Sequence, residues 1–123
     1  MKKLMARGVS RFYHITAAEN AEKILTEGLI PKVAPYQPDE SICDGTEGQP
    51  WIYLGLDIET LRRFWEFRCE EYGITAVPVI LTVWVNTTRQ DVFIDQACDF
   101  DAFKTAIAVK PSAITLLKET HHD

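Results

Sequence analysis

A chain of 123 residues with 46% hydrophobic residues has room for one hydrophobic core, so we expect a single domain over residues 1–123. The net charge of -5 argues against a broad surface for nucleic-acid phosphates, because such affinity comes mainly from lysine and arginine. No apolar run is long enough to span a membrane, and Met1–Arg7 is too short and too charged for a signal peptide, so we expect a cytoplasmic protein without membrane contact.

The chain opens with a predicted short strand, Arg11–His14, followed by a helix over residues 17–27. Thr16 and Glu19 have the spacing of a capping box, which predicts that the helix begins directly after Thr16. Apolar residues then recur at helical spacing, and Gly28 is typical of a left-handed helix stop. His14 would lie beside a helix amino terminus, where backbone N–H groups favour anionic ligands such as nucleotides. The alternative is a purely structural strand and helix, with the histidine hydrogen-bonded in the core.

Residues 32–50 contain much of the proline and glycine and predict a long loop, whose position favours a lid. A strand at Trp51–Leu54 follows, and then a second helix that Asp57 caps and Gly73 ends. The strongest predicted strand is Val77–Val85, which is apolar on both faces.

Two further strands are predicted at Asp91–Ile94 and Ala113–Leu117, with a helical turn or loop at Phe100–Lys104 between them. Helices come early and strands late. This order predicts an α+β fold of two small packed, mostly antiparallel sheets with flanking helices.

Metal and thiol chemistry find little support in the sequence. Cys43, Cys69 and Cys98 are widely spaced and form no CxxC pair, so neither a disulfide framework nor a zinc site is indicated. The adjacent His121 and His122 near the chain end are typical of a frayed tail, and we assign no metal site. No glycine-rich phosphate loop is present.

The spacing of His14, Thr16, Asn20, Ile24 and Gly28-Leu29 resembles the opening motif of the ADP-ribosyltransferase-like superfamily. The pattern is similar to the compact branch with RNA 2'-phosphotransferases and DNA-targeting ADP-ribosyltransferase toxins. The resemblance implies that NAD is the substrate and that ADP-ribose passes to a protein or nucleic-acid acceptor.

By the same resemblance, His14 hydrogen-bonds a ribose hydroxyl of NAD while the backbone of Ile15 holds the nicotinamide amide. Thr16 and Asn20 would face the adenosine half, and Arg11 would meet the pyrophosphate. The alternatives are that Thr16 serves only as a helix cap and that Arg11 is a solvated surface charge.

Trp51–Leu54 resembles the second motif strand of the family, which implies that Tyr53 contacts the nicotinamide. An aromatic face can hold a flat pyridinium ring by stacking and cation–π attraction of about 0.5–2 kcal/mol. Phe64 and Trp65 would then form the other wall of the nicotinamide site. Aromatic residues at helical spacing are more often core residues, which is the alternative for both.

Many active members of the family place a glutamate near the last strand, but no glutamate occurs between Glu71 and Glu119. The stretch Val109–Ile114 resembles the Ile-Pro-Pro-x-x-Ile ending of such domains and points to Asp101 or Asp99 as the acid. Because aspartate is one methylene shorter than glutamate, the reach of this acid is reduced.

The resemblance therefore implies a catalytic set of His14, Tyr53 and Asp101. The second hypothesis is a module that holds NAD, ADP-ribose or a related nucleotide without turnover, or a domain that serves only as a protein-interaction unit. An RNA 2'-phosphotransferase is disfavoured, because the second motif has Tyr53 and the basic cluster of those enzymes is missing.

Overall fold

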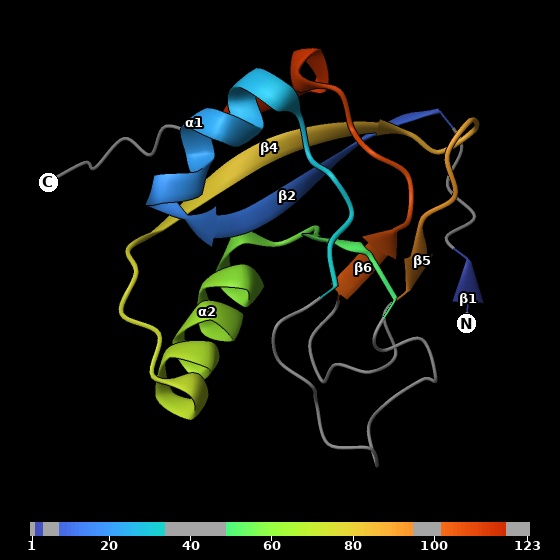
Figure 1. Ribbon diagram of the computed structural model, residues 1–123. Helices are drawn as coiled ribbons and strands as arrows, with labels where there is room; N and C mark the ends of the chain where they lie inside the picture. Colours follow the sequence, from blue (N-terminus) through green and yellow to red (C-terminus); the bar gives the residue numbers. More distant parts are fainter. Residues whose placement is uncertain (1, 4–7, 34–48, 95–101, 118–123) are drawn as a thin grey trace, which may run out of the picture.

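A computed structural model of the chain describes residues 2–3, 8–33, 49–94 and 102–117 (Figure 1). It contains the helices α1 (Ala18–Glu27) and α2 (Ile58–Tyr72) and a short 3-10 turn, η2 (Pro111–Ala113). The strands are β1 (Lys2–Lys3), β2 (Val9–Ala17), β3 (Ile52–Gly55), β4 (Pro78–Asn86), β5 (Phe93–Ile94), β6 (Ala102–Thr105) and β7 (Ile114–Leu116).

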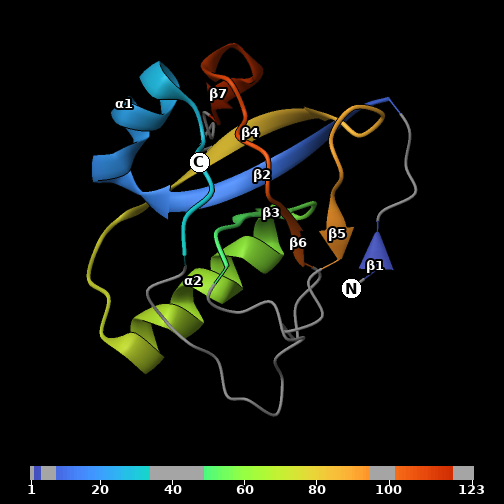
Figure 2. The same cartoon turned by 45° about the vertical axis from the view of Figure 1, so that its right-hand side comes forward.

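The fold is α+β, as predicted, with one open antiparallel sheet in the order β1-β5-β6-β3-β2-β4-β7. The expectation of two separate packed sheets is wrong for the described strands. The reason is that β2 forms backbone pairs on both of its edges, with β3 on one side and β4 on the other. Figure 2 shows β3, β6, β5 and β1 following one another on one side of β2.

The two edges of β2 are paired to very different extents. Nine residue pairs join β2 to β4, from Val9 opposite Asn86 to Ala17 opposite Pro78. The β2–β3 pairing consists of Tyr13 opposite Gly55. We call β2, β4 and β7 the first half-sheet, and β3, β6, β5 and β1 the second half-sheet.

The helices cover opposite faces of the sheet (Figure 1). Ile24 and Leu25 of α1 pack against the larger hydrophobic cluster on one face. Leu61 and Trp65 of α2 pack on the other face, in a smaller cluster with residues of β2 and β4. Burial of these apolar stripes drives the assembly of the three layers.

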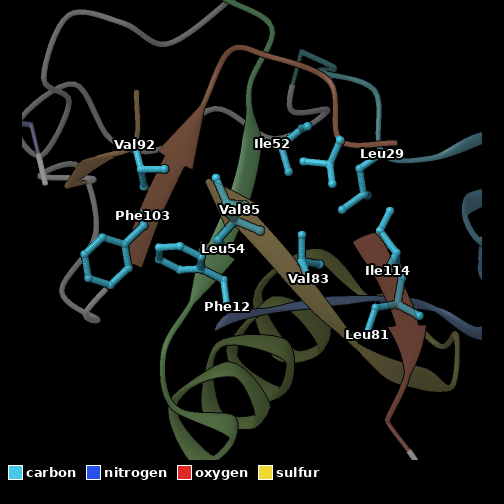
Figure 3. Packing of buried hydrophobic residues seen from close by; sticks show 11 residues of the cluster. Phe12, Leu29, Ile52, Leu54, Leu81, Val83, Val85, Val92, Phe103 and Ile114 are labelled. Atoms are coloured by element: carbon cyan, nitrogen blue, oxygen red, sulfur yellow. The ribbon is translucent and has the colours of Figure 1, made fainter. Parts of the chain in front are cut away.

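The larger cluster spans both half-sheets (Figure 3). Phe12 of β2 is fully buried, and its ring meets the ring of Phe103 of β6 edge to face, with 5.8 Å between centroids. The buried members of the cluster are Phe12, Leu29, Ile52, Leu54, Leu81, Val83, Val85, Val92, Phe103, Val109 and Ile114.

The predicted capping box at the start of α1 is wrong. The helix begins at Ala18, its N-cap is Ala17 without a side-chain hydrogen bond, and Thr16 belongs to β2. The ladder explains this, because Thr16 pairs with Val79 and the Ala18 N–H donates to the Val77 carbonyl at 2.8 Å. Backbone pairing thus replaces the threonine hydroxyl as the partner of the first turn.

The predicted helix stop at Gly28 is confirmed in its position, but Gly28 has a ψ of 177° and not the left-handed helical conformation. The Gly28 N–H donates to the Ile24 carbonyl at 2.7 Å, and Gly28 has a φ of 92°. A Cβ at this position would lie 2.3 Å from the Val109 carbonyl oxygen, so only glycine fits. Leu29 then exchanges two backbone hydrogen bonds with Val109, which ties the helix end to the chain before η2.

The second helix is confirmed with both of its ends. The Asp57 carboxylate accepts the N–H of Glu59 and the hydroxyl of Thr60, and Gly73 takes the left-handed conformation with a φ of 67°. The expected strand at Val77–Val85 is confirmed as β4.

The expected helical turn or loop at Phe100–Lys104 is wrong for its described part. Residues Ala102–Thr105 form strand β6, because they pair with β3 on one edge and β5 on the other. Tertiary pairing decides the conformation of this short segment, which has no clear sequence period of its own.

The predicted lid between the first helix and β3 lies mostly outside the described residues. Its two described ends meet, because Lys32 and Trp51 exchange a pair of backbone hydrogen bonds of 3.1 Å.

Candidate functional site

The segment around His14 and the segment around Tyr53 meet at the point where β2 and β3 separate. The His14 Nδ1 atom lies 2.7 Å from the Tyr53 carbonyl oxygen. A carbonyl oxygen only accepts hydrogen bonds, so Nδ1 carries the proton and donates it. The His14 side chain is thus the hydrogen-bond partner of the Tyr53 carbonyl of β3, beside the single Tyr13–Gly55 pair.

This hydrogen bond fixes the chemistry of the other ring nitrogen. Burial lowers the pKa of His14 below its usual 6.5, the bond to Tyr53 opposes that shift, and the positive charge of Arg68 lowers the pKa further. At neutral pH the ring is therefore neutral, and Nε2 is an acceptor. An acceptor at this position suits a ligand hydroxyl better than a ligand phosphate.

Arg68 of α2 is a site residue that the sequence interpretation missed. Its guanidinium lies over the rings of Phe64 and Trp65, at 5.5 and 5.6 Å from their centroids. The spacing Phe64, Trp65, Arg68 on one helix was the available signal, because residues three and four apart lie on the same side of a helix. The positive charge of Arg68 also acts on His14, whose pKa it lowers.

The two aromatic candidates of α2 differ in burial. Trp65 is 7% exposed and packs among the aliphatic residues of the smaller cluster, whereas Phe64 is half-buried. Each ring has the Arg68 guanidinium over one face. That face is therefore occupied by a cation in the unliganded protein.

Of the remaining candidates of β2 and α1, Thr16 shares the sheet face of His14, whereas the side chains of Arg11 and Ile15 do not. Alternation along a strand puts Arg11 and Ile15 on the face opposite to that of His14 and Thr16. Arg11 is exposed, and its guanidinium lies over the Tyr13 ring at 5.5 Å. Ile15 is buried against α2, while Asn20 is exposed on α1.

The expected acids, Asp101 and Asp99, lie outside the described residues. The described strand β6 instead places Lys104 directly opposite Tyr53. This lysine is 1% exposed, and its ammonium group lies 4.9 Å from the centroid of the Trp51 ring. Lys104 is a second residue that the sequence interpretation missed, because a lone lysine in an unassigned segment carries no pattern.

The described surface includes two depressions. One, of about 280 Å³, lies between the start of α1 and residues 75–77. The other, of about 230 Å³, lies between α2, β4 and β7, and Ile15, Arg62 and Ile80 are among its lining residues. Neither depression is lined by His14 or Tyr53.

Metal and thiol sites are not evident in the described part of the chain. The described residues contain no cluster of three or more potential metal ligands. Cys69 is a free, half-buried thiol, and Cys43 and Cys98 lie outside the described residues. The described helices include none that is long and apolar enough to cross a membrane.

Comparison of the chain with protein-family models, with curated proteins and with solved structures finds no match. Functional assignment therefore rests on the residues and geometry of this chain.

Proposed function

We propose that this chain is an NAD-dependent ADP-ribosyltransferase-like protein that transfers ADP-ribose from NAD to a protein or nucleic-acid acceptor. The observation that supports this proposal most strongly is the 2.7 Å hydrogen bond from His14 to the Tyr53 carbonyl. It joins the two segments that resemble the family's first and second motifs, although they are 39 residues apart in sequence. Segments that must hold one ligand have to meet in this way.

In the proposed reaction, the bond between nicotinamide and its ribose breaks, and the same ribose carbon bonds to an acceptor nucleophile that loses a proton. His14 contributes Nε2 as a hydrogen-bond acceptor for a ribose hydroxyl, because Nδ1 is held by Tyr53. The neutral imidazole adds no positive charge beside a ribosyl centre that becomes cationic. Tyr53 contributes its ring to the nicotinamide, and Asp101 is the proposed carboxylate.

A second candidate function is binding of NAD or ADP-ribose without turnover. The observation that favours it is Lys104, since the strand beside Tyr53 carries a buried lysine opposite the tyrosine. A cation in that position does not stabilise a ribosyl cation, whereas a carboxylate would.

Titration of the purified protein with NAD, following heat and free nicotinamide together, distinguishes these functions. Transfer or hydrolysis releases nicotinamide, and Asp101→Asn should abolish the release while leaving binding in place. Heat without nicotinamide in the wild-type protein supports the binding module. A folded protein that gives neither signal contradicts both candidates and leaves His14 as a scaffold residue.

The informative variant for the histidine is His14→Asn. The asparagine amide nitrogen stands at the same number of bonds from Cα as Nδ1, so it can donate to the Tyr53 carbonyl while the Nε2 acceptor is lost. We expect about a three- to ten-fold loss of NAD affinity, the size of one hydrogen bond. His121→Asn makes the same chemical change at a position not assigned to the site and should leave affinity unchanged.

A further inference from the structure

The two outer strands of the sheet differ in sequence. In the order of the described strands, β1 lies at one end and β7 at the other. Strand β1 consists of two lysines, Lys2–Lys3, and lysine on an outer strand protects against pairing with another chain. Strand β7, Ile114–Leu116, carries neither a charged residue nor a proline. Its outer edge therefore lacks the protection that β1 has.

The backbone of β7 offers hydrogen-bonding groups on this outer edge. The Leu117 N–H donates to the Ile80 carbonyl at 3.0 Å, so the backbone of Leu117 points toward β4. In an antiparallel ladder this direction alternates from one residue to the next. The N–H and C=O groups of Leu116 therefore point away from β4, where the described residues contain no further strand. Groups in this position are a template for one more strand.

An apolar depression lies beside this edge, on the sheet face that α2 partly covers. Its volume is about 230 Å³. Apart from Arg62 of α2, its described lining residues are apolar and comprise Ile15, Pro78, Val79, Ile80, Leu116 and Leu117. Alternate side chains of an added strand point to one face of the sheet. An apolar side chain of such a strand can therefore extend the cluster of Ile80 and Leu117 under α2.

The backbone and the charge of this edge favour a polypeptide with an acidic residue. A nucleic acid has no regular row of N–H and C=O groups to pair with the backbone of β7, whereas an extended peptide has one. Arg62 is the one charged residue among the described lining residues. Its guanidinium attracts a carboxylate. A strand with apolar and acidic side chains on the same side thus matches both the depression and its charge.

We infer that the outer edge of β7 binds an extended segment of a partner protein, which adds to the sheet as a further strand and places apolar and acidic side chains at the depression beside Arg62. Affinity comes from the backbone hydrogen bonds of the added strand, and selectivity comes from its alternate side chains. This inference goes beyond the proposed function and does not depend on it, because β4 and β2 separate β7 from β3.

Hydrogen exchange of the backbone amides, followed by ¹⁵N NMR on the free protein, is the first test. The Leu116 amide should exchange faster than the Thr115 amide, which belongs to the ladder with β4. Protection of Leu116 overturns the inference. Protection that grows with protein concentration would assign the edge to a second copy of the chain, and protection independent of concentration would assign it to another part of the same chain.

The binding test uses two blocked peptides as probes, acetyl-Val-Thr-Asp-Thr-Val-amide and the same peptide with lysine in place of aspartate. Alternation puts the valines and the central residue on one side of the strand. The aspartate peptide should slow exchange of the Leu116 amide. It should also bind about three- to ten-fold tighter than the lysine peptide, because Arg62 attracts the one charge and repels the other. No protection by either peptide, or equal affinity for both, overturns the inference.

Charge reversal supplies the matched control. Arg62→Glu should invert the order of the two peptides, whereas Arg63→Glu should keep it, because Arg63 lies on the same helix but does not line the depression. The same inversion in both variants contradicts a specific role of Arg62. NAD binding by Arg62→Glu should equal that of the wild type. Failure of this inference therefore leaves the proposed function in place, and loss of the proposed function leaves the peptide measurements unaffected.

A backbone variant tests the added strand itself. Leu116→Pro removes the outward N–H, which is not part of the ladder with β4, and should abolish binding of the aspartate peptide. Leu116→Ala keeps this N–H and should retain binding. Equal binding by the two variants overturns pairing at this edge. If Leu116→Pro does not fold, the exchange of the Leu116 amide in the wild-type protein decides.

Discussion

The two edges of β2 differ in how fully their backbone groups are paired, and this difference shows where the fold has groups available for a site. On the β4 edge, nine residue pairs satisfy the backbone along the whole strand. On the β3 edge the pairing consists of Tyr13 opposite Gly55, and the next polar contact comes from a side chain, His14, to the Tyr53 carbonyl. Where strand pairing ends, backbone N–H and C=O groups can form hydrogen bonds with side chains and ligands instead. A fully paired edge has no such groups to offer.

The half-sheets are held together mainly by their shared core. Phe12 and Phe103 touch across the join, and the larger cluster draws residues from both half-sheets. Hydrophobic burial is non-directional and needs no backbone hydrogen bonds, so it can hold two strands that are barely paired. The comparison of the two edges therefore predicts a graded set of mutational effects.

The largest effect should come from Phe12→Ala. Phe12 is fully buried at the join, and truncation of a buried phenylalanine costs about 3–5 kcal/mol of unfolding free energy. Urea denaturation measures this loss. Val9→Ala on the same strand is the control, because Val9 is 66% exposed and should change stability little. Equal effects of the two variants would contradict a core that bridges the half-sheets.

Gly55→Ala should have the next largest effect. A Cβ on Gly55 would lie 2.9 Å from Cγ and Cδ2 of Leu61, so α2 or the β2–β3 join must shift, at a cost of about 1–3 kcal/mol. The double variant with Leu61→Ala removes the clash. We expect the two costs to be clearly less than additive in denaturant unfolding. Additive costs would mean that Leu61 is not the obstacle.

His14→Ala should cost about 1–3 kcal/mol, because it leaves the Tyr53 carbonyl without its side-chain donor. His14→Asn can keep that donor and should retain most of the stability. The two variants distinguish the role of His14 in stability from its role in ligand binding. Both variants should bind NAD weakly, but only His14→Ala should lose stability. Equal stability of alanine and asparagine variants in thermal unfolding would show that the bond does not stabilise the join.

The smallest effect should be the pH dependence due to His14. Its pKa is lowered in the folded protein, so the unfolded chain binds more protons at this group below pH 6.5. The stability from neutral His14 is present above pH 6.5 and is lost as the pH falls toward the lowered pKa. Urea midpoints measured across this range should fall more steeply for the wild type than for His14→Asn. Parallel curves would contradict a lowered pKa.

Much of the local structure could be predicted from the sequence. The stop at Gly28, the cap at Asp57 and the stop at Gly73 depend on φ preferences and short-range hydrogen bonds, and the structure has each of them. The cap at Thr16 failed because a competing long-range partner, Val79 of β4, holds that residue in the strand. Local signals hold where no distant strand competes for the same backbone.

The residues of the candidate site also fall into those that the sequence singled out and those that only the structure shows. The sequence pattern singled out His14 and Tyr53, and the structure joins the His14 ring to the backbone carbonyl of Tyr53. The Tyr53 ring lies on the sheet face opposite to Leu54, and its contact with nicotinamide stays a prediction. Arg68 and Lys104 could not be found in advance, because their importance depends on which rings and strands they face. Asp101 stays a prediction, since it lies outside the described residues.

By itself, the sequence determined the α+β class and the positions of both helix stops, because these depend on neighbours along the chain. Only the tertiary structure decided that the strands form one sheet, that β6 is a strand, and that the β2–β3 edge is left largely unpaired. Pairing between distant segments is a choice among competing partners, and it is set by the shared burial of side chains such as Phe12 and Phe103.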